Sequence, residues 1–236
     1  TIEDSMDAQR AANKLGIPFY VWDFSERFKL DVVDDFVAEY QAGRTPNPCM
    51  RCNERIKFSA LLERGLSLGF EAICTGHYAS IIEDAGGNLE LNWYLEMAKD
   101  QSYVLGMLNA NQLTHSMFPL GATASKDLIR QEATARGLSV ANKPDSYDIC
   151  FIPEGDTREW LKDFVPTDPG KIVDSDGNQL GVHDGHAGFT IGQRKGLRIG
   201  TPAVDRKPRY VLEIRPKTKE IVVGPEEALQ VSDLFG

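Results

Sequence analysis

The chain has 236 residues, of which 42% are hydrophobic and 26% charged, and its formal net charge is −9. This length and composition suit a globular protein of one large or two modest domains, and the acidic balance taken alone argues against nucleic-acid binding. No apolar run in the sequence approaches the length needed to span a bilayer. The N-terminus lacks the basic start and the apolar stretch of a signal peptide. Four cysteines without secretory signals do not make a disulfide framework, so we expect a reducing, cytoplasmic compartment.

The first part of the chain alternates helical and strand patterns. Helices are predicted over residues 4–15, ending at Gly16, over about 26–42, and again after residue 52. Near-continuous apolar runs at 17–24 and 71–78 predict buried parallel strands. This alternation predicts an α/β fold with a parallel sheet, in which ligands bind beyond the carboxyl ends of the strands. Gly76 and His77 fall at such an end.

The middle of the chain contains a hairpin pattern, a helix and a short strand. Gly86-Gly87 is the predicted turn of the hairpin. The helix is predicted over 125–136, with Ser125 as its N-cap and Gly137 as its end. Residues 146–152 alternate as a strand, and Asp156 with Glu159 forms a capping-box pattern for the next helix.

The character of the sequence changes after about residue 165. Two hairpins are predicted, one around Asp176-Gly177 and one around residues 216–219, with a glycine-rich stretch between them. This region predicts a small, mostly β second domain. Its residues 194–219 contain nine basic and two acidic side chains, a local charge of +7, which suits either a solvated face or a surface that binds a polyanion.

The pair Cys49 and Cys52 allows four interpretations. Cys49 and Cys52 with Cys74 and His77 have a spacing acceptable for a Cys3His zinc site, although Cys74 lies in an apolar run typical of a buried core cysteine. A thioredoxin-type pair is less well supported, because Pro46 and Pro48 predict an extended approach. Two inert cysteines are also possible. The fourth interpretation is a nucleophile, because Cys52 directly precedes a predicted helix whose N-terminus would stabilise a thiolate.

A nucleophilic Cys52 needs a partner, and Cys150 is the candidate. It lies on the predicted strand 146–152, with Asp148 on the same strand face. Paired in space with Cys52, it could support thiol–disulfide or persulfide chemistry.

Five blocks of sequence occur in order along almost the whole chain: "GRTPNPCMRCNERIKF", "TGHYA", "KDQSYVL", "DICFIPEGD" and "FTIGQRKGLRIG". Together they resemble the tRNA-specific 2-thiouridylase family, in a form most similar to its actinobacterial branch. The resemblance implies an α/β, parallel-sheet domain of the ATP-pyrophosphatase (adenine nucleotide alpha hydrolase-like) type. It also implies replacement of the C2 oxygen of the wobble uridine in tRNA by sulfur, with an adenylated base and a cysteine persulfide as intermediates.

The resemblance also implies roles for individual residues. Cys52 matches the nucleophile and Cys150 the cysteine that carries the persulfide, while Gly76 matches a glycine that contacts ATP. The positions that match tRNA-contacting residues are Asn47, Pro48, Cys49, His77, Lys99, Asp100 and Gln101. Many relatives have Asp at the position of Cys49, where this sequence has a thiol in place of a carboxylate.

The resemblance divides the chain into three parts. Residues 1–165 correspond to the catalytic domain, 166–224 to a small β-rich central domain, and 225–236 to the start of a C-terminal β-barrel. The Ser-Gly-Gly-x-Asp-Ser phosphate loop of the family is absent from these residues. The first residue is Thr rather than Met, and we expect a fragment or processed chain that is inactive with ATP by itself.

The expected reaction uses ATP with Mg²⁺ and no tightly bound cofactor. The expected partners are tRNA and a sulfur-donor protein, a cysteine desulfurase or a sulfur relay protein, and no membrane. Two alternatives remain open. Another ATP-pyrophosphatase-type ligase would need no cysteine pair, and a zinc-stabilised RNA-binding module would need no catalysis.

Overall fold

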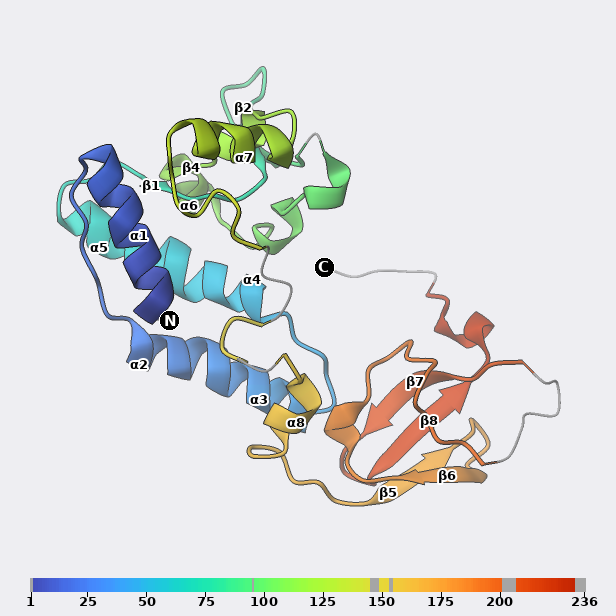
Figure 1. The fold of residues 1–236 in the computed structure, drawn as a ribbon. Helices are drawn as coiled ribbons and strands as arrows, with labels where there is room; N and C mark the ends of the chain where they lie inside the picture. Colours follow the sequence, from blue (N-terminus) through green and yellow to red (C-terminus); the bar gives the residue numbers. More distant parts are fainter. Residues whose placement is uncertain (1, 95, 145–148, 153–154, 201–206, 232–236) are drawn as a thin grey trace. The chain divides into compact units, whose positions relative to one another are not determined.

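The computed structural model describes residues 2–94, 96–144, 149–152, 155–200 and 207–231. The chain forms two compact units, each built from two segments of sequence (Figure 1). Unit 1 comprises Thr1–Val32 and Pro48–Tyr147, and unit 2 comprises Val33–Asn47 and Asp148–Gly236.

Helices make up much of the first 70 residues. Helix α1 (Ile2–Leu15) has acidic residues in its first turn and Lys14 in its last, which suits the helix dipole, and Gly16 follows at φ +70°. A second helical run comprises α2 (Ser25–Phe28), the π-helical turn η1 (Lys29–Val33) and α3 (Asp34–Gln41). A third run comprises α4 (Pro48–Cys52), the π-helical η2 (Asn53–Leu61) and α5 (Leu62–Ser67). These runs confirm the helices predicted over 4–15 and about 26–42, while the third helix begins at Pro48, before its predicted start after residue 52.

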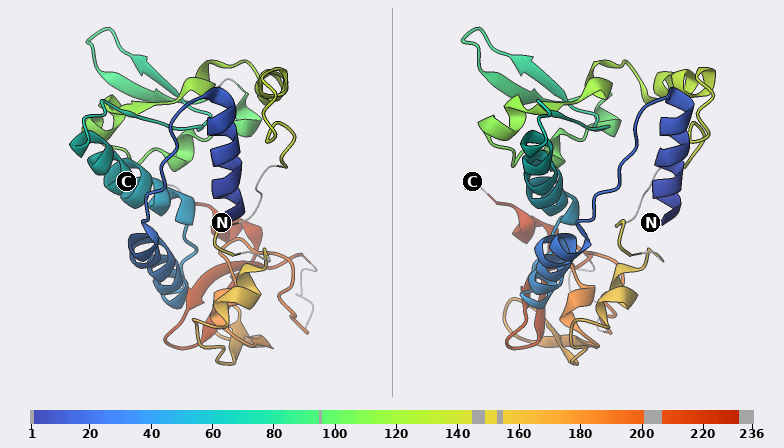
Figure 2. Two further views of the ribbon diagram at one scale, coloured as in Figure 1. Left: turned by 60° about the vertical axis from the view of Figure 1, so that its left-hand side comes forward. Right: turned by 90° about the vertical axis from the view of Figure 1, so that its left-hand side faces the viewer.

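Unit 1 contains two small sheets. Strand β1 (Ile73–Cys74) pairs in parallel with β4 (Ser116–Met117), while β2 (Ser80–Glu83) and β3 (Leu89–Asn92) form the predicted antiparallel hairpin. The hairpin projects from the rest of unit 1 in both views of Figure 2. The remaining elements of unit 1 are η3 (Met97–Lys99), η4 (Ser102–Val104), α6 (Ala110–Thr114), η5 (Pro119–Ala122) and α7 (Lys126–Ala135).

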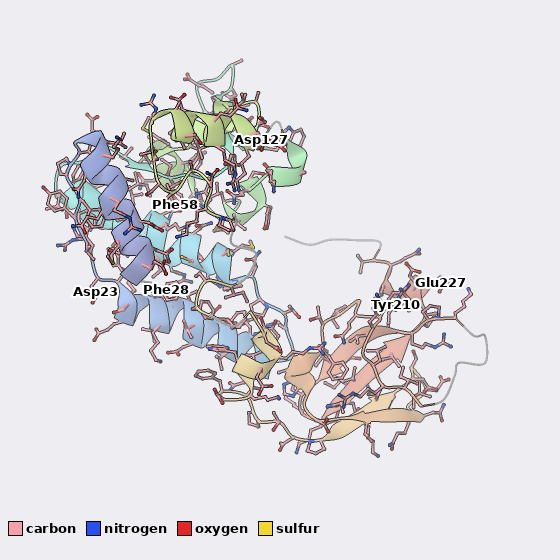
Figure 3. The ribbon with its side chains drawn as sticks, in the orientation of Figure 1. Asp23, Phe28, Phe58, Asp127, Tyr210 and Glu227 are labelled. Atoms are coloured by element: carbon pink, nitrogen blue, oxygen red, sulfur yellow. The ribbon has the colours of Figure 1, made fainter. Side chains whose placement is uncertain are left out.

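The core of unit 1 forms where the third helical run meets the segments that follow β1. Its buried side chains are Phe58, Ala79, Val104, Leu105, Leu113 and Phe118. Phe58, labelled in Figure 3, is 1% exposed and comes from the π-helical part of that run. The predicted caps of α7 are also confirmed, because the Ser125 hydroxyl accepts a hydrogen bond from the Leu128 N–H, and Gly137 has φ +67°.

Two strand predictions in unit 1 need correction. Residues 17–24 form no strand, and the side chains of Ile17, Tyr20 and Val21 are 55%, 74% and 70% exposed. The strand predicted over 71–78 is limited to Ile73–Cys74. An apolar run becomes a buried strand only when a neighbouring strand pairs with it, and β4 is the partner that the described residues supply for β1.

Unit 2 is built around a four-stranded sheet of order β6-β5-β8-β7. Its strands are β5 (Gly170–Val173), β6 (Gln179–His183), β7 (Tyr210–Arg215) and β8 (Glu220–Gly224). Both predicted hairpins are present, and β5 and β8 are paired in parallel between them. One face of the sheet covers a core of Ile172, Leu197, Val211, Ile221 and Val223.

A second cluster in unit 2 joins α3 to α8 (Thr157–Leu161). Phe36 packs there with Ile152, Leu161 and Val165, and its ring makes an edge contact with that of Phe151 at 5.4 Å between centroids. The Asp156 side chain accepts hydrogen bonds from the N–H groups of Arg158 and Glu159, which confirms it as the N-cap. The remaining elements of unit 2 are η6 (His186–Gly188) and η7 (Glu226–Leu229).

The strand predicted over 146–152 is not found in its described part. Residues 145–148, including Asp148, lie outside the described residues, and residues 149–152 form a turn. The apolar side chains of this turn pack on Phe36 rather than in a sheet. Across the described residues, the structure contains no helix that is both long enough and apolar enough to cross a bilayer.

Candidate active site

The two nearby cysteines lie in the first two turns of a helix. Pro48 is its first residue, where the fixed φ of proline favours helix initiation, and its side chain is buried. Cys49 follows in the first turn and is exposed, whereas Cys52 lies in the second turn and is half-buried. The predicted position of Cys52 just before a helix N-terminus is therefore wrong, because the helix begins at Pro48. Cys49 rather than Cys52 therefore lies in the first turn, where the helix dipole favours a negative charge.

His77 is buried just beyond the carboxyl end of β1. Its ring is 8% exposed and packs between Phe58 and Phe118, with both ring centroids 6.0 Å away. The Nδ1 atom forms a hydrogen bond of 2.7 Å with the Thr75 hydroxyl. Burial, and secondly the positive charge of Lys57, lower the pKa of His77 to about 4. The ring is therefore neutral at physiological pH.

Gly76 is exposed beside His77 and has room around it. A Cβ atom built on Gly76 would meet the Leu120 Cδ1 atom at 3.7 Å, an ordinary van der Waals contact. By contrast, a Cβ on the nearby Gly121 would lie 1.8 Å from the backbone oxygen of Ala79. The backbone of unit 1 thus needs glycine at 121 but not at 76.

The block of Lys99, Asp100 and Gln101 is tied into unit 1 by its own side chains. The Asp100 carboxylate accepts hydrogen bonds from the Tyr94 N–H at 2.6 Å and from the Ser102 hydroxyl at 2.7 Å. Gln101 pairs with Tyr78, because its side-chain oxygen accepts from the Tyr78 N–H and its own N–H donates to the Tyr78 carbonyl. Gln101 therefore fixes the backbone that follows His77, while Asp100 ties Tyr94 to Ser102.

Asn53 is a buried polar residue that the sequence analysis missed. It is 1% exposed, and its Nδ2 donates a 2.8 Å hydrogen bond to the Val104 carbonyl. This bond connects the helix of Cys52 to the segment after Gln101, so three motifs of unit 1 share one hydrogen-bonded framework. An amide side chain among the apolar positions of a helix was the available signal.

The segment before Pro48 belongs to unit 2 and packs on its sheet. The hydroxyl groups of Thr45 and Thr190 are hydrogen-bonded at 3.4 Å. A Cβ on Gly43, which has φ +75°, would lie 2.9 Å from a side-chain carbon of Pro216. Asn47 lies two residues after Thr45, at the end of a segment that is anchored to the sheet of unit 2.

The other two cysteines are both exposed. Cys150 lies in the turn of unit 2 that follows the undescribed residues, rather than on a strand. Cys74 was expected in the core but is exposed. It is the last residue of the two-residue strand β1, which pairs with β4 in a sheet of two strands among the described residues. All four cysteines are thiols. Cys52 belongs to unit 1 and Cys150 to unit 2.

The described part of the chain contains no candidate metal site. Nowhere in it do three His, Cys, Asp or Glu side chains lie close enough together to hold an ion. Cys49, Cys52, Cys74 and His77 are all described, so the four proposed zinc ligands do not converge.

Part of the basic stretch 194–219 is neutralised by ion pairs with carboxylates from outside it. Lys219 pairs with Asp168 at 2.8 Å and Lys207 with Glu227 at 3.2 Å. Arg198 lies 3.5 Å from Asp184. Figure 3 shows Glu227 close to Tyr210 of β7. Asp205 and Arg206 lie outside the described residues. The local charge is therefore smaller than the count from sequence.

Comparison with known families identifies the class of protein. Residues 1–154 match the model of the tRNA methyl transferase HUP domain, and residues 158–225 match that of the tRNA methyl transferase PRC-barrel domain. The chain thus combines a HUP domain of the ATP-pyrophosphatase type with a PRC-barrel-like domain, which confirms the predicted fold class.

Similar proteins narrow this class. The chain is 67% identical over 236 residues to the tRNA-specific 2-thiouridylase MnmA of Clavibacter michiganensis subsp. michiganensis. It is 66% identical to the proteins of that name from Leifsonia xyli subsp. xyli and Kocuria rhizophila. Each match covers 100% of this chain and 61%, 64% and 62% of the respective relative, so the chain spans about three fifths of their length. The chain belongs to the tRNA-specific 2-thiouridylase family, as its motifs indicated.

Proposed function

We propose that the protein containing this chain transfers sulfur to C2 of the wobble uridine of tRNA in an ATP-dependent reaction, which makes it a tRNA-uridine 2-sulfurtransferase. The observation that carries the proposal is the match of the whole chain to relatives of that name, with cysteines at both expected positions. The tRNA substrate, together with four cysteines that do not make a disulfide framework in a chain of this size, favours the cytoplasm as its location.

The reaction requires an oxygen to leave from C2 of the base. ATP, when bound, supplies the activation by converting this oxygen into an adenylate, from which AMP departs. Gly76 lies beyond the carboxyl end of a parallel strand, where ligands of such sheets bind, and it is exposed. Because it has no side chain, a nucleotide could contact its backbone directly. The described residues provide no acidic cluster for Mg²⁺, so we assign no protein ligand to that ion.

The two cysteines divide the sulfur chemistry between them. Cys150 receives a sulfur atom from a donor protein, a cysteine desulfurase or a sulfur relay protein, and becomes a persulfide. Its exposure on a turn suits this transfer between proteins. The terminal sulfur of the persulfide attacks C2 and displaces AMP, which joins the base to Cys150 through a disulfide.

Cys52 then releases the product. Its thiolate attacks the Cys150 sulfur, so that a Cys52–Cys150 disulfide forms as the base leaves as 2-thiouridine. The two thiols are oxidised while the transferred sulfur is reduced, and an external dithiol restores them. Asn47, Pro48, Cys49 and Lys99 are proposed to contact the tRNA. For His77, Asp100 and Gln101, whose side chains are buried or bonded within unit 1, we propose support of the tRNA-contacting backbone.

The test uses the complete protein and three cysteine variants. Cys52→Ser and Cys150→Ser should abolish formation of 2-thiouridine, measured by mass spectrometry of digested tRNA, because each removes a sulfur that changes oxidation state. Cys74→Ser is the matched control, since Cys74 is also an exposed thiol, and it should leave thiolation intact. Normal 2-thiouridine levels in Cys150→Ser would contradict the mechanism, and no thiolation by the wild-type protein would contradict the function.

A further inference from the structure

A short loop of unit 2, residues 192–196, presents two cations that have no ion-pair partner among the described residues. The side chains of Arg194 and Lys195 are exposed, and no described carboxylate pairs with either. They differ in this respect from Lys207, Lys219 and Arg198, each of which has an acidic partner. Within the described part of the basic stretch, this loop is therefore the place where two adjacent cations both lack an acidic partner.

The loop is held in one conformation by Gln193. Its side-chain oxygen accepts a hydrogen bond from the Thr190 N–H at 3.1 Å, and its side-chain nitrogen donates to the Lys195 carbonyl at 2.9 Å. One side chain thus ties together both sides of the loop. The glycines at 192 and 196 have φ of +83° and +78°, a region in which glycine is favoured.

The backbone of the loop is also bonded to the sheet. The Gly192 N–H donates to the Val211 carbonyl at 2.8 Å, and the Val211 N–H donates to the Gln193 carbonyl at 3.0 Å. Val211 lies in β7 and is fully buried in the core of unit 2. Arg194 and Lys195 therefore extend from a loop that a rigid strand supports, which reduces the entropy that binding would cost.

The position of the loop connects it to the segment proposed to reach the target base. Thr190 lies two residues before the loop, and its N–H donates to the Gln193 side chain. The hydroxyl group of Thr190 is also hydrogen-bonded to that of Thr45 in the same unit. Asn47 follows Thr45 by two residues. The cations thus lie in the part of unit 2 that also holds this segment, where RNA flanking an extruded base would run.

We propose that the loop of residues 192–196 is a preformed binding site for the phosphate backbone of RNA, with Arg194 and Lys195 as its phosphate ligands and Gln193 as the residue that positions them. The proposal rests on the proposed function for the nature of the RNA. Phosphate contacts of this kind position the RNA without reading its sequence. Each contact releases counterions, so the number of contacts is measurable from the salt dependence of binding.

The experiment measures binding of the complete protein to a tRNA transcript with a wobble uridine at several salt concentrations. The double variant Arg194→Ala with Lys195→Ala should bind about tenfold more weakly or worse at 0.1 M salt, with a salt slope lower by about one to two phosphate contacts. The control, Lys207→Ala with Lys219→Ala, removes the same charge from the same unit. Its affinity and slope should stay close to wild type, because those lysines are engaged by Glu227 and Asp168.

A third variant separates positioning from charge. Gln193→Ala keeps both cations but releases the loop, so binding should weaken about three- to fivefold with the salt slope unchanged. An unchanged affinity and slope in the Arg194 and Lys195 double variant, with the wild type binding normally, would overturn the proposal. Equal losses in the lysine control would also overturn it, because the effect would then be one of net charge. If the wild type bound no tRNA, the proposed function itself would fail.

Discussion

The side chain of Asn53 donates a hydrogen bond to the backbone carbonyl of Val104 at 2.8 Å, between two residues separated by 51 positions in the sequence. Asn53 immediately follows Cys52, and Val104 follows the block of Lys99, Asp100 and Gln101. Gln101 is in turn hydrogen-bonded to Tyr78, which follows β1. The helix of the proposed nucleophile is therefore connected, through the segment 101–104, to the end of β1. Asn53 is therefore a candidate positioning residue for Cys52.

Asn53→Ala should change the environment of Cys52 as well as stability. Loss of the bond leaves the buried Val104 carbonyl unsatisfied, which costs about 1–3 kcal/mol. Because the first turns of the helix are then less constrained, the pH profile of Cys52 alkylation, followed by mass spectrometry, should shift.

Gln112→Ala is the matched control for Asn53→Ala. Gln112 also donates from its side-chain amide to a backbone carbonyl at 2.8 Å, but that carbonyl belongs to Phe58, further along the same helical run. Because the Gln112 side-chain oxygen also accepts a 3.0 Å hydrogen bond from the Asn109 N–H, we expect an equal or larger loss of stability without a shift in the alkylation profile. If both variants moved the profile equally, or neither did, Asn53 would have only a structural role.

Protonation of His77 should destabilise unit 1 as the pH falls. The folded pKa of about 4 lies below the usual value of 6.5, so its contribution is complete above pH 6.5 and is lost progressively towards pH 4. After allowance for solvent screening, we expect a loss of about 2 kcal/mol over this range. The measurement is denaturant unfolding of the complete protein across these pH values. His77→Gln should remove this part of the pH dependence, and an identical profile in the variant would show that other groups cause it.

Gly76→Ala should separate nucleotide binding from folding. The added methyl group has room beside Leu120, so we expect a change in unfolding free energy within about 0.5 kcal/mol. If the nucleotide contacts this backbone, the affinity for ATP, measured by calorimetry on the complete protein, should fall about tenfold.

Gly121→Ala provides the contrast for Gly76→Ala. Its Cβ would overlap the Ala79 carbonyl oxygen, so the melting temperature should drop clearly. An unchanged ATP affinity in the Gly76 variant would remove that residue from the nucleotide site.

Cys49→Asp should be tolerated. The residue is exposed in the first turn of a helix, where a carboxylate interacts favourably with the helix dipole by about 0.3–1 kcal/mol. Thiolation by the complete protein should persist in this variant, measured as 2-thiouridine content. Complete loss would mean that Cys49 takes part in the chemistry or binds a metal.

The same position tests the zinc alternative. We expect no stoichiometric zinc in the reduced complete protein, measured by elemental analysis. One zinc ion per chain that is lost in Cys49→Ser would restore the interpretation of Cys49 and Cys52 as metal ligands.

Elements whose signals are local were predictable from the sequence. Gly16 and Gly137 end their helices, Ser125 and Asp156 cap theirs, and Gly177 allows the turn between β5 and β6. Each depends on interactions between residues three or four positions apart, which a sequence window contains. The ordered motifs, read together, likewise identified the family and the α/β fold class.

Properties that depend on residues far apart in the chain became visible in the folded structure. Ile17, Tyr20 and Val21 of the apolar run 17–24 are exposed because burial of such a run requires a paired strand, and no sequence window shows whether one is present. Lys219 is neutralised by Asp168, from a segment 51 positions earlier, whereas Arg194 and Lys195 have no such partner among the described residues. Charge counted along a sequence cannot distinguish these cases, because ion pairs form according to distance in space.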